Sequence, residues 1–189
     1  MNSMKKLVLL AGCVCLLGLS RLSAQDKFYT KEGRIYFNAT GDMEKIEATN
    51  KTAVSVLDIK TGAFQFAILL KGFEFEKALM QEHFNENYAE SDKFPKSEFK
   101  GIVLNNKEIP YGKAGVYDVR VKGMLSLHGE SKEVTASGKF TIRDGRIESA
   151  ADFEILLSDF RIAIPGLVKD KVSNHAKIQV DCSLQPLKN

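Results

Sequence analysis

Apolar and polar residues alternate with a period of two along most of the chain, which gives each segment one apolar and one polar face. Such alternation predicts β-strands that are buried on one side only. The clearest predicted strands lie near 33–40, 62–72, 116–127, 134–142, 147–157 and 177–184, and weaker ones near 44–48, 52–58 and 97–105. Asp144-Gly145, between two of them, is a strong hairpin signal.

The segment from Glu76 to about Glu90 breaks this alternation and predicts a helix. Its apolar residues fall near one helical stripe, and its glutamates face away from that stripe. The stripe contains Leu79, Met80, His83, Phe84 and Tyr88. We expect this helix to cover part of the structure with its apolar side.

Many one-sided strands and a single helix predict a mainly β fold, either one antiparallel barrel or a sandwich. The residues predicted to point inward are bulky and mostly apolar. A barrel of about eight strands is either filled by its own side chains or holds one small ligand, and the alternation does not decide between the two.

The first 24 residues predict a signal peptide. Lys5 and Lys6 precede an apolar run at residues 7–19, and Ala24 is a small residue at the expected cleavage point. The run is too short to span a bilayer of about 30 Å, so no transmembrane segment is predicted. The alternative is a lipoprotein signal, because Leu-Ala-Gly precedes Cys13. We expect a periplasmic or secreted domain over 25–189.

Charge and cysteine content change after cleavage. The signal segment removes three basic and no acidic residues from the chain's 27 basic and 24 acidic ones, which lowers the net charge from +3 to zero. The mature chain then has no basic excess that would favour a nucleic-acid partner. Cys182 becomes the only cysteine, on the apolar face of the last strand, where it is interpreted as a small buried hydrophobe.

No motif for catalysis is present. The three histidines, His83, His128 and His175, do not form a metal-binding pattern along the sequence. His128 precedes Gly129 and predicts a turn residue with a solvated ring, whereas His175 is assigned to a loop. We expect no catalytic or metal-binding residues. Convergence of histidines at a barrel mouth stays open as an alternative.

Several short motifs resemble the YceI-like family. They are FNENY at 84–88, Phe94-Pro95, FKG at 99–101, VKGMLSLHG at 121–129 and FRIAIP at 160–165. The resemblance implies an eight-stranded antiparallel, lipocalin-like β-barrel with a short helix near its mouth. It also implies an exported, non-enzymatic protein that needs no cofactor and holds an isoprenoid or another lipid.

The candidate ligand-binding residues follow from this fold. The inner-wall candidates are Phe37, Phe66, Val119, Val121, Phe153 and Phe160. Leu79, Met80 and Phe84 are candidates for the underside of a helical cover, and His83 at its edge for a positioning or gating role. Two other functions stay open: a solid barrel that serves a structural or interaction role, and a metal-binding protein that uses mouth histidines. The sequence does not determine the oligomeric state.

Overall fold

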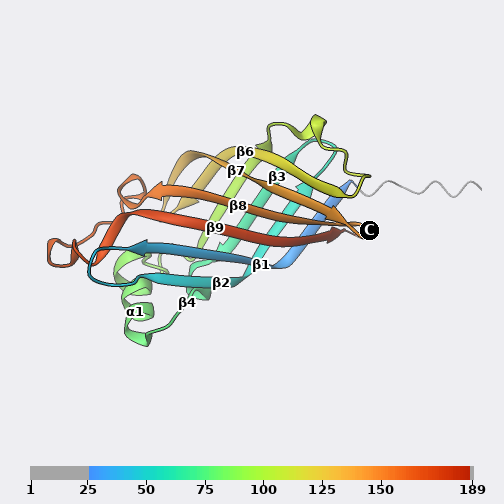
Figure 1. Ribbon diagram of the computed structural model, residues 1–189. Coiled ribbons are helices and arrows are strands. Elements are labelled where there is room, and N and C mark those ends of the chain that lie inside the picture. Colours follow the sequence, from blue (N-terminus) through green and yellow to red (C-terminus); the bar gives the residue numbers. More distant parts are fainter. Residues whose placement is uncertain (1–25, 188–189) are drawn as a thin grey trace, which may run out of the picture.

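A computed structural model describes residues 26–187, which form one closed antiparallel β-barrel (Figure 1). Eight strands follow one another around it in the order β1-β9-β8-β7-β6-β5-β3-β2, and pairing of β2 with β1 closes the ring. The strands are β1 (Lys27–Thr40), β2 (Glu47–Asp58), β3 (Ala63–Leu69), β5 (Lys96–Val103), β6 (Gly115–Leu127), β7 (Glu130–Arg143), β8 (Arg146–Leu156) and β9 (Val172–Pro186). The predicted lipocalin-like fold class is confirmed.

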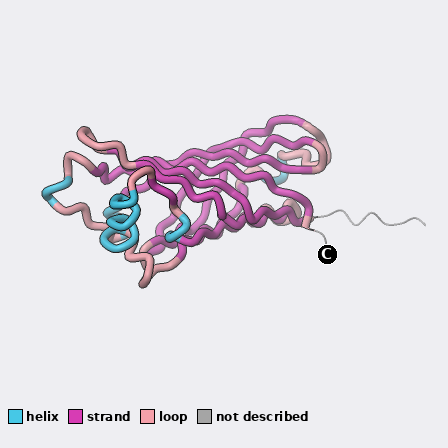
Figure 2. The backbone as a smooth tube through the Cα atoms, turned by 90° about the horizontal axis from the view of Figure 1, so that it is seen from below, coloured by secondary structure: helices cyan, strands magenta, loops and turns pink. Residues whose placement is uncertain are grey.

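Short elements connect the strands. They are η1 (Leu70–Gly72), β4 (Glu74–Phe75), α1 (Ala78–His83), η2 (Phe84–Tyr88), η3 (Asn106–Glu108), η4 (Leu157–Phe160) and η5 (Gly166–Val168). The two-residue β4 pairs only with β2. α1 lies at one end of the barrel, and β1 starts and β9 finishes at the other (Figure 1). Most of the helical turns gather at the α1 end (Figure 2).

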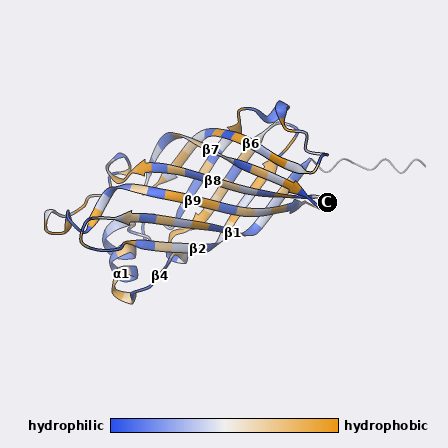
Figure 3. Ribbon diagram, viewed as in Figure 1, coloured by the Kyte–Doolittle hydropathy of each residue, from blue (hydrophilic) through white to orange (hydrophobic). Residues whose placement is uncertain are grey.

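The strands form where the sequence alternates, because one face of each strand packs inside the barrel and the other meets water. In β1, Ile35, Phe37 and Ala39 are buried, whereas the residues between them are more exposed. Figure 3 shows the same alternation of hydrophobic and hydrophilic residues along the other strands. The weak strands predicted at 44–48 and 52–58 are one strand, β2, and His175 lies within β9 and not in a loop.

The helix is shorter than the predicted segment 76–90. α1 has six residues and continues as a π-helical turn, η2, in which the Ala89 N–H donates to the Phe84 carbonyl. Glu90 then takes a left-handed conformation, with φ of 43°. This backbone conformation ends the helix, because it cannot continue a right-handed ladder of hydrogen bonds.

The barrel interior divides into two packed regions along its axis. One lies toward the chain ends and includes Phe28, Leu57, Phe140 and Leu184. The other lines the α1 end. Phe66, Phe99 and Val180 pack against both regions.

A pair of facing glycines leaves room for the Phe99 ring. A Cβ atom on Gly101 would lie 2.5 Å from the end of this ring, and one on Gly123 would lie 2.7 Å from it. Since Gly101 and Gly123 pair directly across β5 and β6, a side chain at either position would clash with the backbone of the facing strand as well as with Phe99.

Other predictions have mixed outcomes. The predicted signal peptide and the alternative lipid attachment at Cys13 fall outside the described residues. Within residues 26–187, no helix has the length and apolar character needed to cross a membrane. Cys182 is buried, as predicted, and burial raises the pKa of its thiol to about 12.

Candidate functional site

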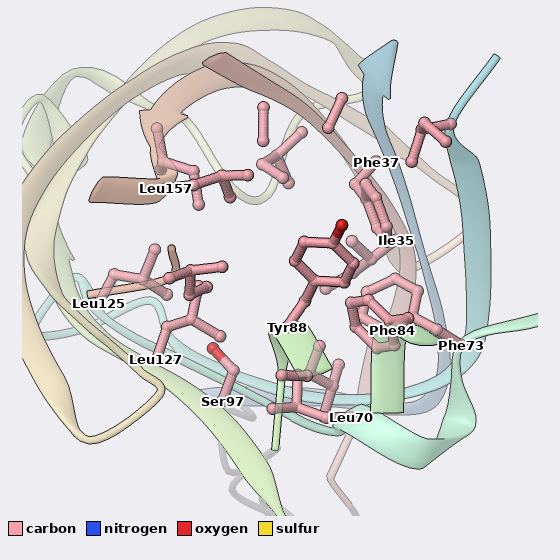
Figure 4. A pocket seen from close by; sticks show the side chains of 18 of the residues that line it. Ile35, Phe37, Leu70, Phe73, Phe84, Tyr88, Ser97, Leu125, Leu127 and Leu157 are labelled. Carbon is pink, nitrogen blue, oxygen red and sulfur yellow. The ribbon is translucent and has the colours of Figure 1, made fainter. Parts of the chain in front are cut away.

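A cavity of about 570 Å³ occupies the half of the barrel nearest α1 (Figure 4). Its wall is mostly apolar and comes from every strand of the ring except β2, with further residues from the connections at the α1 end. The lining includes Ile35, Phe37, Phe66, Ile68, Leu70, Phe73, Leu125, Leu127, Phe153, Ile155, Leu157, Ile162 and Ile178. This hollow does not fit the solid-barrel alternative, in which side chains would fill the interior.

Small inward residues keep this half of the barrel open. Ala136 on β7, Ala151 on β8 and Ala176 on β9 all line the cavity. Nearer the chain ends, the inward positions of β7 carry Phe140 and Ile142, which pack into the closed region. The same strand therefore changes from small to large side chains where the cavity stops, and this change sets the depth of the hollow.

The cover over the cavity is held by a cluster of aromatic rings. The Phe84 ring centroid lies 5.6 Å from that of Phe37, 5.5 Å from Phe73 and 5.1 Å from Phe75. Such spacings are favourable for aromatic pairs. Phe84 thus fixes the junction of α1 and η2 onto β1 and the segment around β4.

The other cover residues are more exposed than the predicted helical stripe implied. Leu79 is 60% exposed although it lines the cavity, because α1 lies at the edge of the mouth. Met80 is half-buried and His83 is exposed, and both also line the cavity.

The structure brings eight of the ten candidate residues together around the cavity. They are Phe37, Phe66, Leu79, Met80, His83, Phe84, Val121 and Phe153. Val119 shares a strand face with Val121, and both pack in the closed region, but only Val121 also reaches the cavity lining. Phe160 is buried in the core at the mouth end, outside the cavity lining. Alternation predicts the face of a residue and not its depth in the barrel.

Sequence reasoning also missed lining residues whose signal was present. Leu125 and Leu127 alternate with the polar residues of β6 in the same way as Val121, and both line the cavity. Tyr88 belongs to the predicted helical stripe, and in Figure 4 its ring stands inside the cavity with its hydroxyl away from the wall. Leu157 ends the alternation of the predicted strand 147–157, whereas Ile162 gave no such signal, because it lies in the irregular connection after η4.

Charged groups at the mouth connect three segments. Glu44, in the β1–β2 connection, lies 3.3 Å from the Lys77 ammonium before α1 and 3.9 Å from the Lys171 ammonium after η5. The backbone supports the same arrangement, since the Met43 N–H donates to the Asp170 carbonyl at 3.0 Å. These contacts hold the rim of the mouth together.

His128 is not the solvated turn residue that the sequence predicted. Only 10% of its side chain is exposed. Its Nδ1 lies 2.9 Å from the Phe160 carbonyl oxygen and its Nε2 lies 2.7 Å from the Glu90 carboxylate. The Phe94 ring packs edge-on against the imidazole at 4.6 Å. The turn between β6 and β7 places this ring where η4 and the end of η2 meet, so His128 joins three segments at the barrel mouth.

The histidines do not gather at one place. His128 is held by Glu90 and Phe160, His175 pairs with Glu154 on the neighbouring strand, and His83 lies on α1. Within residues 26–187, no three histidine, cysteine, aspartate or glutamate side chains form a group that could hold a metal ion.

Comparison with known protein families matches the YceI-like domain over residues 24–184. The chain belongs to the YceI-like family. The resemblance carried by the FNENY and VKGMLSLHG motifs is therefore confirmed. No curated protein matches the sequence of this YceI-like chain.

Solved structures share the YceI-like fold at low identity. A polyisoprenoid-binding domain from Saccharophagus degradans, implicated in plant cell wall breakdown, matches with a TM-score of 0.74 at 11% identity, over 86% of this chain and 99% of that chain. BcnA from Burkholderia cenocepacia matches with a TM-score of 0.65 at 14% identity, over 80% and 95%. A Campylobacter jejuni YceI protein matches with a TM-score of 0.52 at 16% identity, over 73% of this chain and 81% of that chain. These similarities establish the fold of this YceI-like chain.

Proposed function

We propose that this YceI-like protein is exported and binds one long apolar chain, such as an isoprenoid or another lipid, inside its barrel. The observation that carries the proposal is the apolar cavity of about 570 Å³, which reaches the mouth beside α1. The polyisoprenoid-binding description of the Saccharophagus degradans domain supports the same class of ligand.

The cavity size favours a long chain over a small apolar molecule. If a methylene group takes about the liquid volume of a water molecule, roughly 30 Å³, the cavity holds on the order of 20 chain carbons. Burial of each carbon is worth about 0.8 kcal/mol, so a full cavity gains about 16 kcal/mol. Association itself costs about 4–15 kcal/mol. A chain of about 10 carbons gains only about 8 kcal/mol and is held weakly on this scale.

The position of the polar groups favours holding the chain without transforming it. At the mouth, the Glu44 carboxylate contacts the ammonium groups of both Lys77 and Lys171. Deeper in the cavity, the Ser97 hydroxyl donates to the Ser126 carbonyl at 2.9 Å. A chain threaded into the barrel would lie against methyl groups and rings, which offer no acid or base. We propose that the protein catalyses no reaction and needs no cofactor other than the bound lipid.

Ligand displacement tests the proposal. N-phenyl-1-naphthylamine, which fluoresces in apolar surroundings, would be bound to the protein and displaced by geranylgeraniol. Ala151 lines the cavity, whereas its neighbour Ala150 is exposed on the outer face of β8. We expect Ala151→Phe to fill part of the cavity and weaken geranylgeraniol binding at least tenfold.

The matched control is Ala150→Phe, which adds the same ring outside the barrel and should leave binding unchanged. Equal affinities of the two variants would contradict a ligand inside the barrel. His83 lines the mouth from α1, and we propose that it positions or gates the chain. We expect His83→Ala to change the dissociation rate of geranylgeraniol, and an unchanged rate would remove this role.

Export is a separate part of the proposal and rests on the predicted signal peptide. Edman sequencing of the protein from the periplasm or medium should start at Gln25. A mature protein that starts at Cys13 with an attached lipid would support the lipoprotein alternative instead.

A further inference from the structure

Tyr88 places a hydroxyl group inside a mostly apolar cavity. It is the last residue of the π-helical turn η2, and the half-buried ring packs against the core at the mouth end. Figure 4 shows the ring standing between the two sides of the cavity, with the hydroxyl oxygen pointing into the open space.

The other tyrosines all have a hydrogen-bond partner for their hydroxyl groups. Tyr111 donates to the Asn106 amide oxygen at 2.7 Å and Tyr117 donates to the Lys113 carbonyl at 3.1 Å. The hydroxyls of Tyr36 and Tyr29 lie 3.4 and 3.3 Å from the side-chain amides of Asn38 and Gln185. Within residues 26–187, the Tyr88 hydroxyl alone among the five tyrosines has no such partner in the protein.

An unpaired hydroxyl in the cavity disfavours a pure hydrocarbon as ligand. A hydrocarbon chain would displace water from the Tyr88 oxygen and offer no hydrogen bond in return, which costs free energy. An oxygen atom on the chain would accept a hydrogen bond from the Tyr88 hydroxyl and remove this cost. Binding sites for apolar ligands commonly use a few such polar groups to fix the ligand's orientation.

The surroundings favour a neutral acceptor over a charged one. Burial raises the pKa of the Tyr88 phenol, which keeps it protonated and able to donate. The ammonium groups of Lys77 and Lys171, which share the Glu44 carboxylate, lie at the rim of the mouth. Tyr88 itself offers only a neutral donor, and a carboxylate or phosphate beside it would lose water against the apolar wall, which is costly.

We propose that the ligand is an oxygenated lipid whose neutral carbonyl, ether or hydroxyl oxygen accepts a hydrogen bond from Tyr88 within the cavity. This inference rests on the proposed function, since it requires a chain inside the barrel. Tyr88 would then set the depth to which the chain enters.

Two probes of equal shape test the inference. Farnesylacetone is an isoprenoid ketone, and its hydrocarbon isostere has a methylene group in place of the carbonyl oxygen. Both would displace N-phenyl-1-naphthylamine from the wild-type protein and from Tyr88→Phe. We expect the wild-type protein to bind the ketone about three- to tenfold more tightly than the isostere, in line with the net worth of one hydrogen bond.

The substitution Tyr88→Phe should abolish this preference by weakening ketone binding, and it should not weaken binding of the isostere. Tyr36→Phe removes a hydroxyl that lies against Asn38 and Glu47 outside the cavity, and it serves as the control. An unchanged ketone preference in Tyr88→Phe would overturn the role of Tyr88 while leaving the proposed function intact. If neither probe displaced the dye from the wild-type protein, the proposed function itself would fail.

Discussion

Truncation of Phe84 should detach the cover from the barrel mouth. Phe84→Ala removes a ring that contacts Phe37, Phe73 and Phe75 with centroid distances between 5.1 and 5.6 Å. Complete removal of a buried phenylalanine costs about 3–5 kcal/mol. Phe84 is only half-buried, because one side of its ring faces the cavity, and we therefore expect about 2–3 kcal/mol.

The loss of stability in Phe84→Ala should be concentrated in the cover as well as felt by the whole domain. α1 has six residues and no buried side chain, so little besides Phe84 and the neighbouring η2 holds it on the barrel. Amide hydrogen exchange measured by mass spectrometry should therefore accelerate across residues 78–88 more than in the strands. If the whole expected 2–3 kcal/mol also lowered the free energy of global unfolding, the melting temperature would fall by about 4–12 °C for a domain of this size.

Leu79→Ala is the control on the same helix. Leu79 is 60% exposed, so its truncation should change stability by less than about 0.5 kcal/mol and leave exchange in the strands unaltered. The reasoning would be refuted if Phe84→Ala matched Leu79→Ala in both melting temperature and local exchange. That result would mean that the aromatic cluster does not anchor the cover.

Three further predictions concern the frame around the cavity. His128→Ala should lower the free energy of unfolding, measured in urea, by about 2–3 kcal/mol, because it removes two hydrogen bonds at a buried junction. The control His175→Ala removes an exposed side chain and should cost less than about 0.5 kcal/mol. Equal effects of the two substitutions would contradict the role of His128 in joining the three segments. Burial raises the pKa of the Cys182 thiol from 9.0 to about 12, so this thiol favours the folded state below pH 9 and loses that contribution as pH rises toward 12. In urea melts over this pH range, the free energy of unfolding should fall more steeply for the wild type than for Cys182→Ala. Equal slopes for the two proteins would exclude the effect. Gly123→Ala should destabilise the barrel by about 1–3 kcal/mol through its clash with the backbone of Lys100 and Gly101 and with the Phe99 ring, whereas Gly112→Ala, with nothing within 4 Å, should be close to neutral in the same melts.

The sequence pattern was sufficient to predict the one-sided strands, because each strand shows one face to the core and one to water, and the family resemblance then implied a barrel and not a sandwich. It could not predict where the barrel is hollow. Val119 and Val121 are equivalent in the alternation and pack in the same closed region, yet only Val121 also lines the cavity. The difference depends on which residues lie opposite them across the barrel, and this information is not local in sequence.

Local patterns also failed where the chain leaves regular structure. A glycine after His128 suggested a solvated turn, but the partners of the imidazole, Glu90 and Phe160, are 38 and 32 residues away. Tyr88 was recognised as part of an apolar stripe, whereas the lack of a partner for its hydroxyl became visible only with the folded cavity around it. Long-range polar contacts carry no periodic signal of the kind that predicts strands.

The most direct test of the central claim is to identify what fills the barrel. The protein would be purified without detergent from the cells that produce it, extracted with organic solvent and analysed by mass spectrometry, beside the Ala151→Phe variant. The account predicts a long-chain lipid near one molecule per wild-type chain and a strong reduction in the variant. Wild-type protein that repeatedly contains no lipid, or equal lipid in both proteins, would contradict it.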